Sequence, residues 1–261
     1  MPPGPFLTWT IEDKKTKPRL KRPILIEGLP GIGNVGKIAV DYLIDELRAE
    51  KYCSFFAEGM SHSVYVNEEN LIEMPQIELY YKKNGRQDLL LLCGDVQPPD
   101  EISAHHFCEK VLDVFGSFDG QRIITIGGIG LQEVPTNSKI YCTGNNAKAV
   151  KEFTKDTKAR TDIYGVVGPI IGVSGMLLGL GQRRKIPAVA LLAETFGHPM
   201  YVGLKEARAV IKLLATKLNL DVNLKDLNKE IRRIDKEIMK AEQMSQQPPA
   251  GSSPRSTSYI G

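Results

Sequence analysis

The chain has 261 residues, of which 42% are hydrophobic and 25% charged, a balance that suits one large globular domain or two small ones. Its 34 basic residues barely outnumber its 31 acidic residues, so the net charge of +3 does not indicate a partner such as nucleic acid. The four cysteines are widely spaced and contain no CxxC pair. We therefore expect reduced thiols in a cytoplasmic protein.

Residues 1–21 are predicted to form a flexible N-terminal arm. They combine a proline-rich, apolar start with most of the basic run Lys14–Arg22, KKTKPRLKR. Runs of like charge usually lie on a solvated face, so an arm preceding the first strand is favoured over a binding patch. The core domain is expected over residues 22–222.

The first regular elements follow in the stretch PILIEGLPGIGNVGK, Pro23–Lys37. Pro23–Glu27 is a short apolar run without helical spacing, which predicts a buried strand. From Asn34 onward, apolar residues recur at the spacing of an amphipathic helix as far as Leu47. Strand, glycine-rich turn and helix together predict the first half of a βαβ unit.

The glycine-rich loop over 28–37 has three interpretations. Its glycines match a dinucleotide-binding pattern, but Glu58 lies 27 residues beyond Gly31, a loose fit to the expected acidic residue. The loop also approaches a P-loop, except that Ile38 stands where a magnesium-binding hydroxyl is needed. We favour a close-packed turn that requires glycine for steric reasons. Because helix N-termini carry unpaired N–H groups, an anion-binding loop remains an alternative, with the candidates Gly31, Gly33, Gly36 and Lys37.

The rest of the chain alternates between predicted strands and predicted helices. Strands are predicted over 52–57, 64–66, 76–83, 88–93, 122–126, 139–142, 163–167 and 188–192, and helices over 100–115, 147–153, 173–184 and 203–218. Asn84-Gly85 is typical of a two-residue hairpin turn. We therefore predict an α/β fold with a largely parallel sheet, flanking helices and an antiparallel hairpin insert. Ligand sites are expected at the strand ends 28–36, 94–99, 127–130 and 194–199.

Residues 163–181 are uncharged over 19 positions, which is long enough to span a bilayer. Six glycines and Pro169 interrupt this stretch, and no second such stretch occurs. A strand and a helix of a soluble domain are therefore favoured, and no membrane partner is predicted.

No catalytic or metal-binding residues are predicted. Ser174 lies in a sequence that misses the G-x-S-x-G motif, because Met176 replaces the final glycine. Glu194 and His198 could partner it, but such sequence proximity is common by chance. The adjacent histidines at 105 and 106 face different directions on a helix, and no fourth metal ligand is evident. Neither a cofactor nor a metal is expected.

Four ordered blocks resemble the proteasome assembly chaperone family, in its archaeal branch. They are EGLPGIGNVGKIAVDYLIDEL (27–47), IGGIG (126–130), GVSGMLLGL (172–180) and LLAETFGHPMYVGLKEA (191–207). The resemblance implies an α/β sandwich similar to nucleoside phosphorylases, with a pocket that has lost its catalytic groups. It also implies a homo-oligomeric, non-catalytic protein that binds the proteasome core particle as assembly factor or activator. The alternative is a phosphorylase-like or nucleotide-binding enzyme that uses the loop 28–37.

A C-terminal oligomerisation helix is predicted over 223–244. Its apolar residues recur at intervals of three and four, at Leu224, Leu227, Ile231, Ile234 and Ile238. Such a narrow stripe favours pairing with other helices over packing on its own domain. Residues 245–261 are rich in Ser, Pro, Gln and Gly and are predicted to be a disordered tail.

The tail ends in Tyr259, Ile260 and Gly261. The resemblance implies proteasome binding by a C-terminal hydrophobic–Tyr–any tripeptide, which inserts between α-subunits of the core particle. This chain departs from that pattern, because its tyrosine is third from the end and follows the polar Ser258. Two possibilities are therefore left open: the tail docks on the core particle, or the tail has no binding role.

Overall fold

The computed structural model describes residues 8–60 and 62–245. The chain divides into two compact units, one up to Asn223 and one from Leu224, which are described separately.

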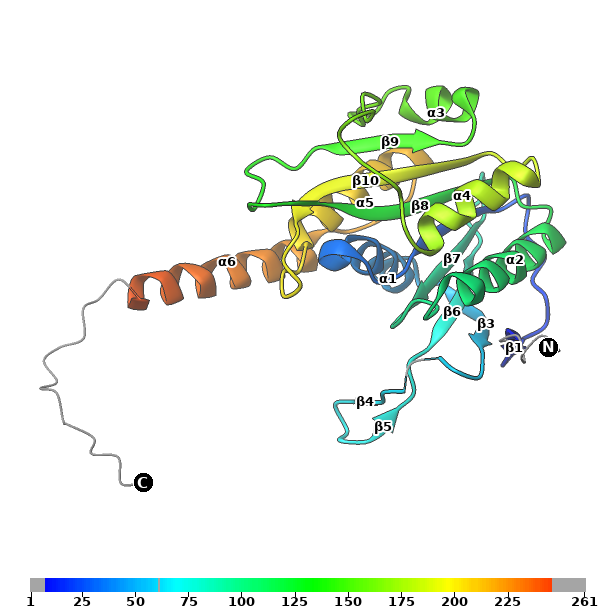
Figure 1. Cartoon of the computed structure of the whole chain (residues 1–261), viewed down its shortest axis with the longest axis horizontal. Helices are drawn as coiled ribbons and strands as arrows, with labels where there is room; N and C mark the ends of the chain where they lie inside the picture. Colours follow the sequence, from blue (N-terminus) through cyan, green and yellow to red (C-terminus); the bar gives the residue numbers. More distant parts are fainter. Residues whose placement is uncertain (1–7, 61, 246–261) are drawn as a thin grey trace, which may run out of the picture. The chain divides into compact units, whose positions relative to one another are not determined.

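The first unit is built on an eight-stranded sheet with the strand order β1-β3-β6-β7-β2-β8-β10-β9 (Figure 1). The four central strands β7, β2, β8 and β10 are parallel, and the remaining four pair antiparallel at the two sides. The strands are β1 (Thr10–Glu12), β2 (Ile24–Gly28), β3 (Glu50–Phe56), β6 (Ile77–Lys82), β7 (Leu89–Gly94), β8 (Arg122–Leu131), β9 (Ile140–Gly144) and β10 (Ala188–Phe196). A separate two-stranded hairpin, β4 (Tyr65–Val66) and β5 (Ile72–Glu73), lies between β3 and β6 in the chain.

Helices flank this sheet, which confirms the predicted α/β class (Figure 1). They are α1 (Val35–Leu47), α2 (Glu101–Ser117), α3 (Ala147–Thr154), α4 (Val173–Arg183) and α5 (Leu204–Leu218), and a short 3-10 helix, η1 (Ile32–Asn34), precedes α1. α1 contacts α5 and packs on β2, β7 and β8, whereas α2 contacts α4, which packs on β8 and β10. The predicted antiparallel hairpin is present as β6 and β7, and β3 pairs antiparallel with β6.

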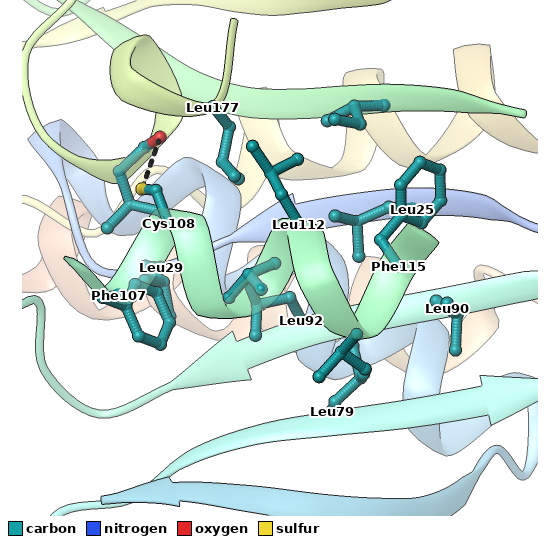
Figure 2. Packing of buried hydrophobic residues seen from close by; sticks show 14 of the residues in the cluster. Leu25, Leu29, Leu79, Leu90, Leu92, Phe107, Cys108, Leu112, Phe115 and Leu177 are labelled. Carbon is teal, nitrogen blue, oxygen red and sulfur yellow. Dashed lines mark hydrogen bonds between the residues drawn. The ribbon is translucent and has the colours of Figure 1, made fainter. Parts of the chain in front are cut away.

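The central strands are mostly apolar because helices cover both faces. Leu89 to Leu92 of β7 are each 0% exposed, so successive side chains are buried on alternate faces. Figure 2 shows one of these faces, where Phe107, Leu112 and Phe115 of α2 and Leu177 of α4 pack on Leu25 of β2 and on Leu90 and Leu92 of β7. Burial of this cluster fixes α2 and α4 against the sheet.

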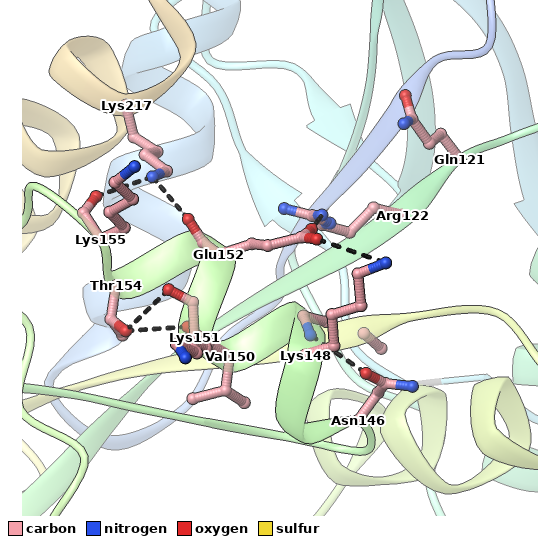
Figure 3. A network of polar contacts seen from close by, with 12 residues as sticks. Gln121, Arg122, Asn146, Lys148, Val150, Lys151, Glu152, Thr154, Lys155 and Lys217 are labelled. Atoms are coloured by element: carbon pink, nitrogen blue, oxygen red, sulfur yellow. Dashed lines mark hydrogen bonds and ion pairs between the residues drawn. The ribbon is translucent and has the colours of Figure 1, made fainter.

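Helix α3 is held by polar contacts (Figure 3). Asn146 caps its N-terminus by accepting the N–H of Ala149 at 3.1 Å. Glu152 forms an ion pair with Arg122 of β8 at 2.9 Å. Lys217 of α5 donates to the backbone oxygens of Glu152 and Lys155, at 2.7 and 2.8 Å. These contacts tie α3 to β8 and α5.

The expected flexible arm is structured where it is described. Trp9 is 2% exposed, donates from Nε1 to the backbone oxygen of Ser103 at 3.0 Å, and packs against the ring of Phe107. The next residues form β1, which pairs antiparallel with β3. One buried aromatic anchor and a short strand therefore attach this segment to the sheet, and the basic residues that follow are largely exposed.

Three local predictions are wrong. The glycines 127, 128 and 130 do not end β8, because the ladder with β10 continues to Leu131↔Phe196. Residues 163–167 do not form a buried strand; Tyr164 is fully exposed, and β9 already occupies the free side of β10. Asn84-Gly85 is not a two-residue turn, since Lys82 pairs with Leu89 and leaves a six-residue loop over 83–88.

The second unit contains α6 (Lys225–Ser245), which covers nearly all of the predicted helix 223–244. Ion pairs three residues apart, Asp226–Lys229 and Glu230–Arg233, lie on its surface. Residues 246–261 of the predicted tail lie outside the described residues. Within the described part of the chain, no helix combines the length and apolarity needed to cross a membrane.

Candidate functional site: a cavity at the carboxyl ends of the strands

The four parallel strands end at one edge of the sheet, and β2 stops first. Its pairing with β8 ends at Glu27↔Thr125, whereas β8 and β10 stay paired to Leu131↔Phe196. After β2 the next strand of this sheet is β3, which lies toward the β1 edge. After β8 the next strand is β9, which forms the opposite edge. Open α/β sheets bind ligands at such a point, and a cavity of about 600 Å³ lies here. We call it the carboxyl-edge cavity.

The walls of the carboxyl-edge cavity come from five segments that are far apart in the sequence. They are Gly31 and Ile32 after β2, residues 97–101 and Ala104 at the start of α2, Gly127–Ile129 of β8 with Leu192 of β10, and Val167, Pro169–Gly172, Ser174 and Met176 around the start of α4. Most of these side chains are apolar. Three of the four predicted ligand-binding strand ends, 28–36, 94–99 and 127–130, contribute to it. The described lining contains carboxylates but neither Lys, Arg nor His.

A buried carboxyl group lies behind Ser174. Glu27 of β2 is 0% exposed; its Oε2 accepts the Ser174 hydroxyl at 2.8 Å and its Oε1 accepts the Leu29 N–H at 3.1 Å. Burial raises the pKa of Glu27 to about 7, although the two hydrogen bonds act in the opposite direction. While Glu27 is ionised, Ser174 uses its proton on it, and only the lone pairs of the hydroxyl remain to accept a hydrogen bond from a ligand.

Gln97 joins the two sides of the cavity. Its Nε2 donates to the backbone oxygen of Pro30 at 2.6 Å, and its Oε1 accepts the N–H of Val173 at 3.1 Å. Gly172 has φ +80°, and a Cβ there would lie 2.4 Å from Oε1 of Gln97. The glycine therefore lets the amide reach the start of α4, and the amide fixes the width of the cavity.

The candidate anion-binding loop is accounted for mainly by packing. Gly33 has φ +64°, and a Cβ on Gly36 would lie 2.5 Å from the backbone oxygen of Ile126. Of the four candidates, only Gly31 lines the cavity. The anion site stays a prediction.

Lys37, the fourth candidate, is already engaged. Its ammonium lies 3.1 Å from each of the carboxylates of Asp41 and Asp95 and from the backbone oxygen of Gly94. Burial opposes the charged form, but these carboxylates raise the pKa of Lys37 overall. An incoming anion would have to displace two carboxylates.

Ser174, Glu194 and His198 have separate partners. Ser174 binds Glu27, whereas Glu194 accepts from the hydroxyl of Tyr141 at 3.2 Å. His198 accepts the N–H of Met200 at Nδ1 and stacks on Phe196. The serine is thus paired with a different carboxyl group from the one considered in the sequence.

The two adjacent histidines lie on α2 with ring centroids 6.1 Å apart. Over residues 8–60 and 62–245, no three His, Cys, Asp or Glu side chains are grouped in a way that could hold a metal ion.

Two residues of the site were missed by the sequence reasoning. Glu27 had a signal, because an acid inside the otherwise apolar run ILIEG is costly to bury without partners. Gln97 carried no such signal, since its two backbone partners come from loops 67 and 76 residues away.

The other candidate residues lie elsewhere. Leu224 precedes α6, and Leu227, Ile231, Ile234 and Ile238 are on it, within the second unit. Tyr259, Ile260 and Gly261 lie outside the described residues.

Comparisons with known proteins place this architecture among related chains. A model of the PAC2 family matches residues 25–242. The crystal structure of Pyrococcus furiosus PbaB, an archaeal proteasome activator, is 29% identical, with a TM-score of 0.81 over 90% of this chain and 99% of that one. Pyrococcus furiosus PbaA, an archaeal homologue of proteasome-assembly chaperone, is 23% identical, with a TM-score of 0.74 over 92% and 94%, and shows the shared fold. An uncharacterized protein of Methanocaldococcus jannaschii is 28% identical over 253 residues, 93% of each chain.

Proposed function

The chain belongs to the PAC2 family, and on this basis we propose that it is a homo-oligomeric, non-catalytic protein that binds the proteasome core particle. It acts there as an assembly factor or as an activator. The family resemblance expected from the sequence is confirmed. The observation that carries the proposal is the similarity to the activator PbaB over nearly the full length of both chains.

The chemistry of the carboxyl-edge cavity supports a binding role. Its described lining offers no cationic side chain for a phosphate or for a developing negative charge. The Ser174 hydroxyl is paired with the buried carboxyl of Glu27, and no histidine or cationic side chain of the described lining stands beside this pair to complete a catalytic group. Lys37 is held by Asp41 and Asp95. A phosphorylase or nucleotide hydrolase would need free groups in these places.

Helix α6 supplies the proposed contact between copies. Its apolar residues repeat at the spacing of a coiled-coil seam, and charged residues fill the positions between them. Pairing several copies through this seam would gather their C-terminal segments into one multivalent particle.

The C-terminal segment supplies the proposed contact with the α-subunits of the core particle. Tyr259 is its aromatic anchor, and Ile260 and Gly261 complete the docking residues. Several tethered copies reach effective concentrations near the millimolar range, so avidity exceeds single-site affinity by roughly 10²–10⁴. A weak single contact is then sufficient.

The proposed place of action is the cytoplasm, with neither nucleic acid nor a membrane as partner. The four cysteines are buried free thiols, in keeping with a reducing compartment.

Co-purification with the cognate core particle tests the proposal. The intact chain is expected to retain the particle, and a chain lacking residues 259–261 is expected to lose it while keeping its fold and oligomer size. Tyr259→Ala should cause most of the same loss. Equal retention by the intact and shortened chains would show that the tail does not dock.

A further inference from the structure

Large apolar side chains are exposed around the carboxyl-edge cavity. Ile32 and Ile171 belong to its lining, yet they are 49% and 82% exposed. Tyr164, three residues before the lining residue Val167, is fully exposed. Exposed apolar groups gathered at one place on a soluble protein mark a surface that another molecule covers.

The apolar surface continues beyond the cavity on the side of β10. Met200 and Val202 are 83% and 50% exposed. Gly203, which directly follows Val202, lies next to η1, because its N–H donates to the backbone oxygen of Gly33 at 2.8 Å. A small molecule inside the cavity would leave these side chains in water. An extended chain running across the cavity mouth would cover them.

The polar groups of the cavity define what such a chain must offer. While Glu27 is ionised, the Ser174 hydroxyl donates to it and offers a ligand only its lone pairs; each polar atom of the Gln97 amide already has one partner within the protein. With Glu27 ionised, the group that reaches Ser174 has to be a donor, which a peptide N–H provides.

The charges of the cavity point the same way. Asp100 and Glu101 lie in its lining at the start of α2; Asp100 caps that helix by accepting the Ser103 N–H at 2.8 Å, and the described lining holds no cationic side chain to pair with Glu101. The exposed Glu101 makes the mouth favourable for a basic side chain and unfavourable for an anion.

From these observations we propose that the carboxyl-edge cavity binds an extended apolar peptide segment that carries a basic side chain and belongs to a partner protein. The inference rests on the proposed function in taking the partner to be a protein. The cavity volume of about 600 Å³ lies within the range of known ligand sites. Apolar side chains of the segment fill it, a backbone N–H donates to Ser174, and the basic side chain meets Glu101.

Gly31 allows the cavity to be filled without disturbing its walls. Its φ of −163° is extended backbone that any residue adopts, and a Cβ there has nothing within 4 Å. Gly31→Leu would therefore place a large apolar side chain in the cavity. Gly116→Leu is the matched control, because Gly116 is exposed near the other end of α2, also has open space, and is distant from the lining.

Fluorescence anisotropy with three labelled ten-residue peptides tests the proposal on the full chain. The first peptide carries four Leu or Ile and two Arg, the second replaces Arg by Glu, and the third replaces the apolar residues by Ser. Saturable binding is expected for the first, with affinity at least tenfold weaker for the other two. Gly31→Leu should weaken binding of the first peptide at least tenfold, Glu101→Gln severalfold, and Gly116→Leu not at all.

Several outcomes would overturn the proposal. Equal binding of the first peptide to wild type and Gly31→Leu would show that the peptide does not bind in the cavity. Equal binding of the Arg and Glu peptides would show that Glu101 does not select a basic side chain. A change of particle mass in Gly31→Leu, seen by light scattering, would assign the cavity to a second copy of the chain. Tighter peptide binding in Tyr259→Ala would assign the cavity to the chain's own C-terminus.

Retention of the core particle without peptide binding would refute this inference alone, whereas peptide binding without retention would refute the proposed function alone.

Discussion

The buried carboxyl group of Glu27 makes the stability of the fold depend on pH. Its pKa is about 7 in the folded chain and 4.5 in its ordinary state. Below pH 4.5 the group is protonated in both the folded and the unfolded chain, so it does not lower the free energy of unfolding. Above that pH the unfolded chain releases the proton first, and the free energy of unfolding falls by about 1.4 kcal/mol per pH unit until pH 7. The loss amounts to about 3 kcal/mol and stays constant at higher pH.

Glu27→Gln removes this dependence while keeping the shape of the side chain. The amide oxygen can still accept the Leu29 N–H, and the amide N–H₂ can donate to Ser174, whose hydroxyl is then free to turn. Urea unfolding at fixed chain concentration, between pH 4.5 and 8, should therefore show the wild type losing about 3 kcal/mol more than the variant. Glu12→Gln, at an exposed position on β1, serves as the control and should follow the wild type. Parallel curves for wild type and Glu27→Gln would refute the reasoning.

Three further predictions concern other parts of the chain. Replacing Ile231 and Ile234 by Lys places like charges in the α6 seam, so light scattering should report smaller particles; an unchanged mass would show that the seam is not the oligomer contact. Gly36→Ala brings a Cβ to 2.5 Å from the backbone of Ile126, so thermal or urea unfolding should show a loss of about 1–3 kcal/mol, whereas Gly116→Ala should show none. Wild type and Lys37→Ala should both lack ATP hydrolysis and nucleoside phosphorolysis, and turnover that disappears in Lys37→Ala would favour an enzyme instead.

Elements with a strong periodic pattern could be predicted from the sequence. The apolar run of β2 and the helical spacing of α1 each placed an element to within a few residues, because burial on two faces or on one stripe dictates the residue types. The meeting of the parallel strand ends at one edge followed from the alternation of strands and helices. Three of the four strand ends named from the sequence line the carboxyl-edge cavity.

Contacts between distant residues could not be predicted in the same way. The glycines 127, 128 and 130 are typical of a turn, yet β8 continues through them because β10 supplies a parallel ladder along its side. Trp9 is buried by Phe107, nearly a hundred residues away, so the attachment of β1 left no local signal. The pairing of Glu27 with Ser174 spans 147 residues for the same reason.

The apolar content of 163–171 misled the prediction in a more informative way. Apolar runs normally indicate burial, but here Tyr164 and Ile171 face solvent at the carboxyl edge. A segment that looks like core in sequence and lies on the surface in structure is a candidate for contact with another molecule.

Binding of the cognate core particle tests the central claim most directly. With the particle immobilised on a surface, the intact chain, the chain lacking 259–261, and the Ile231→Lys/Ile234→Lys variant are compared at equal subunit concentration. The account predicts tight binding of the intact chain, abolished binding without the tail, and a loss of avidity of roughly 10²-fold or more when the seam is broken. Failure of the intact chain to bind the core particle at all would contradict the account.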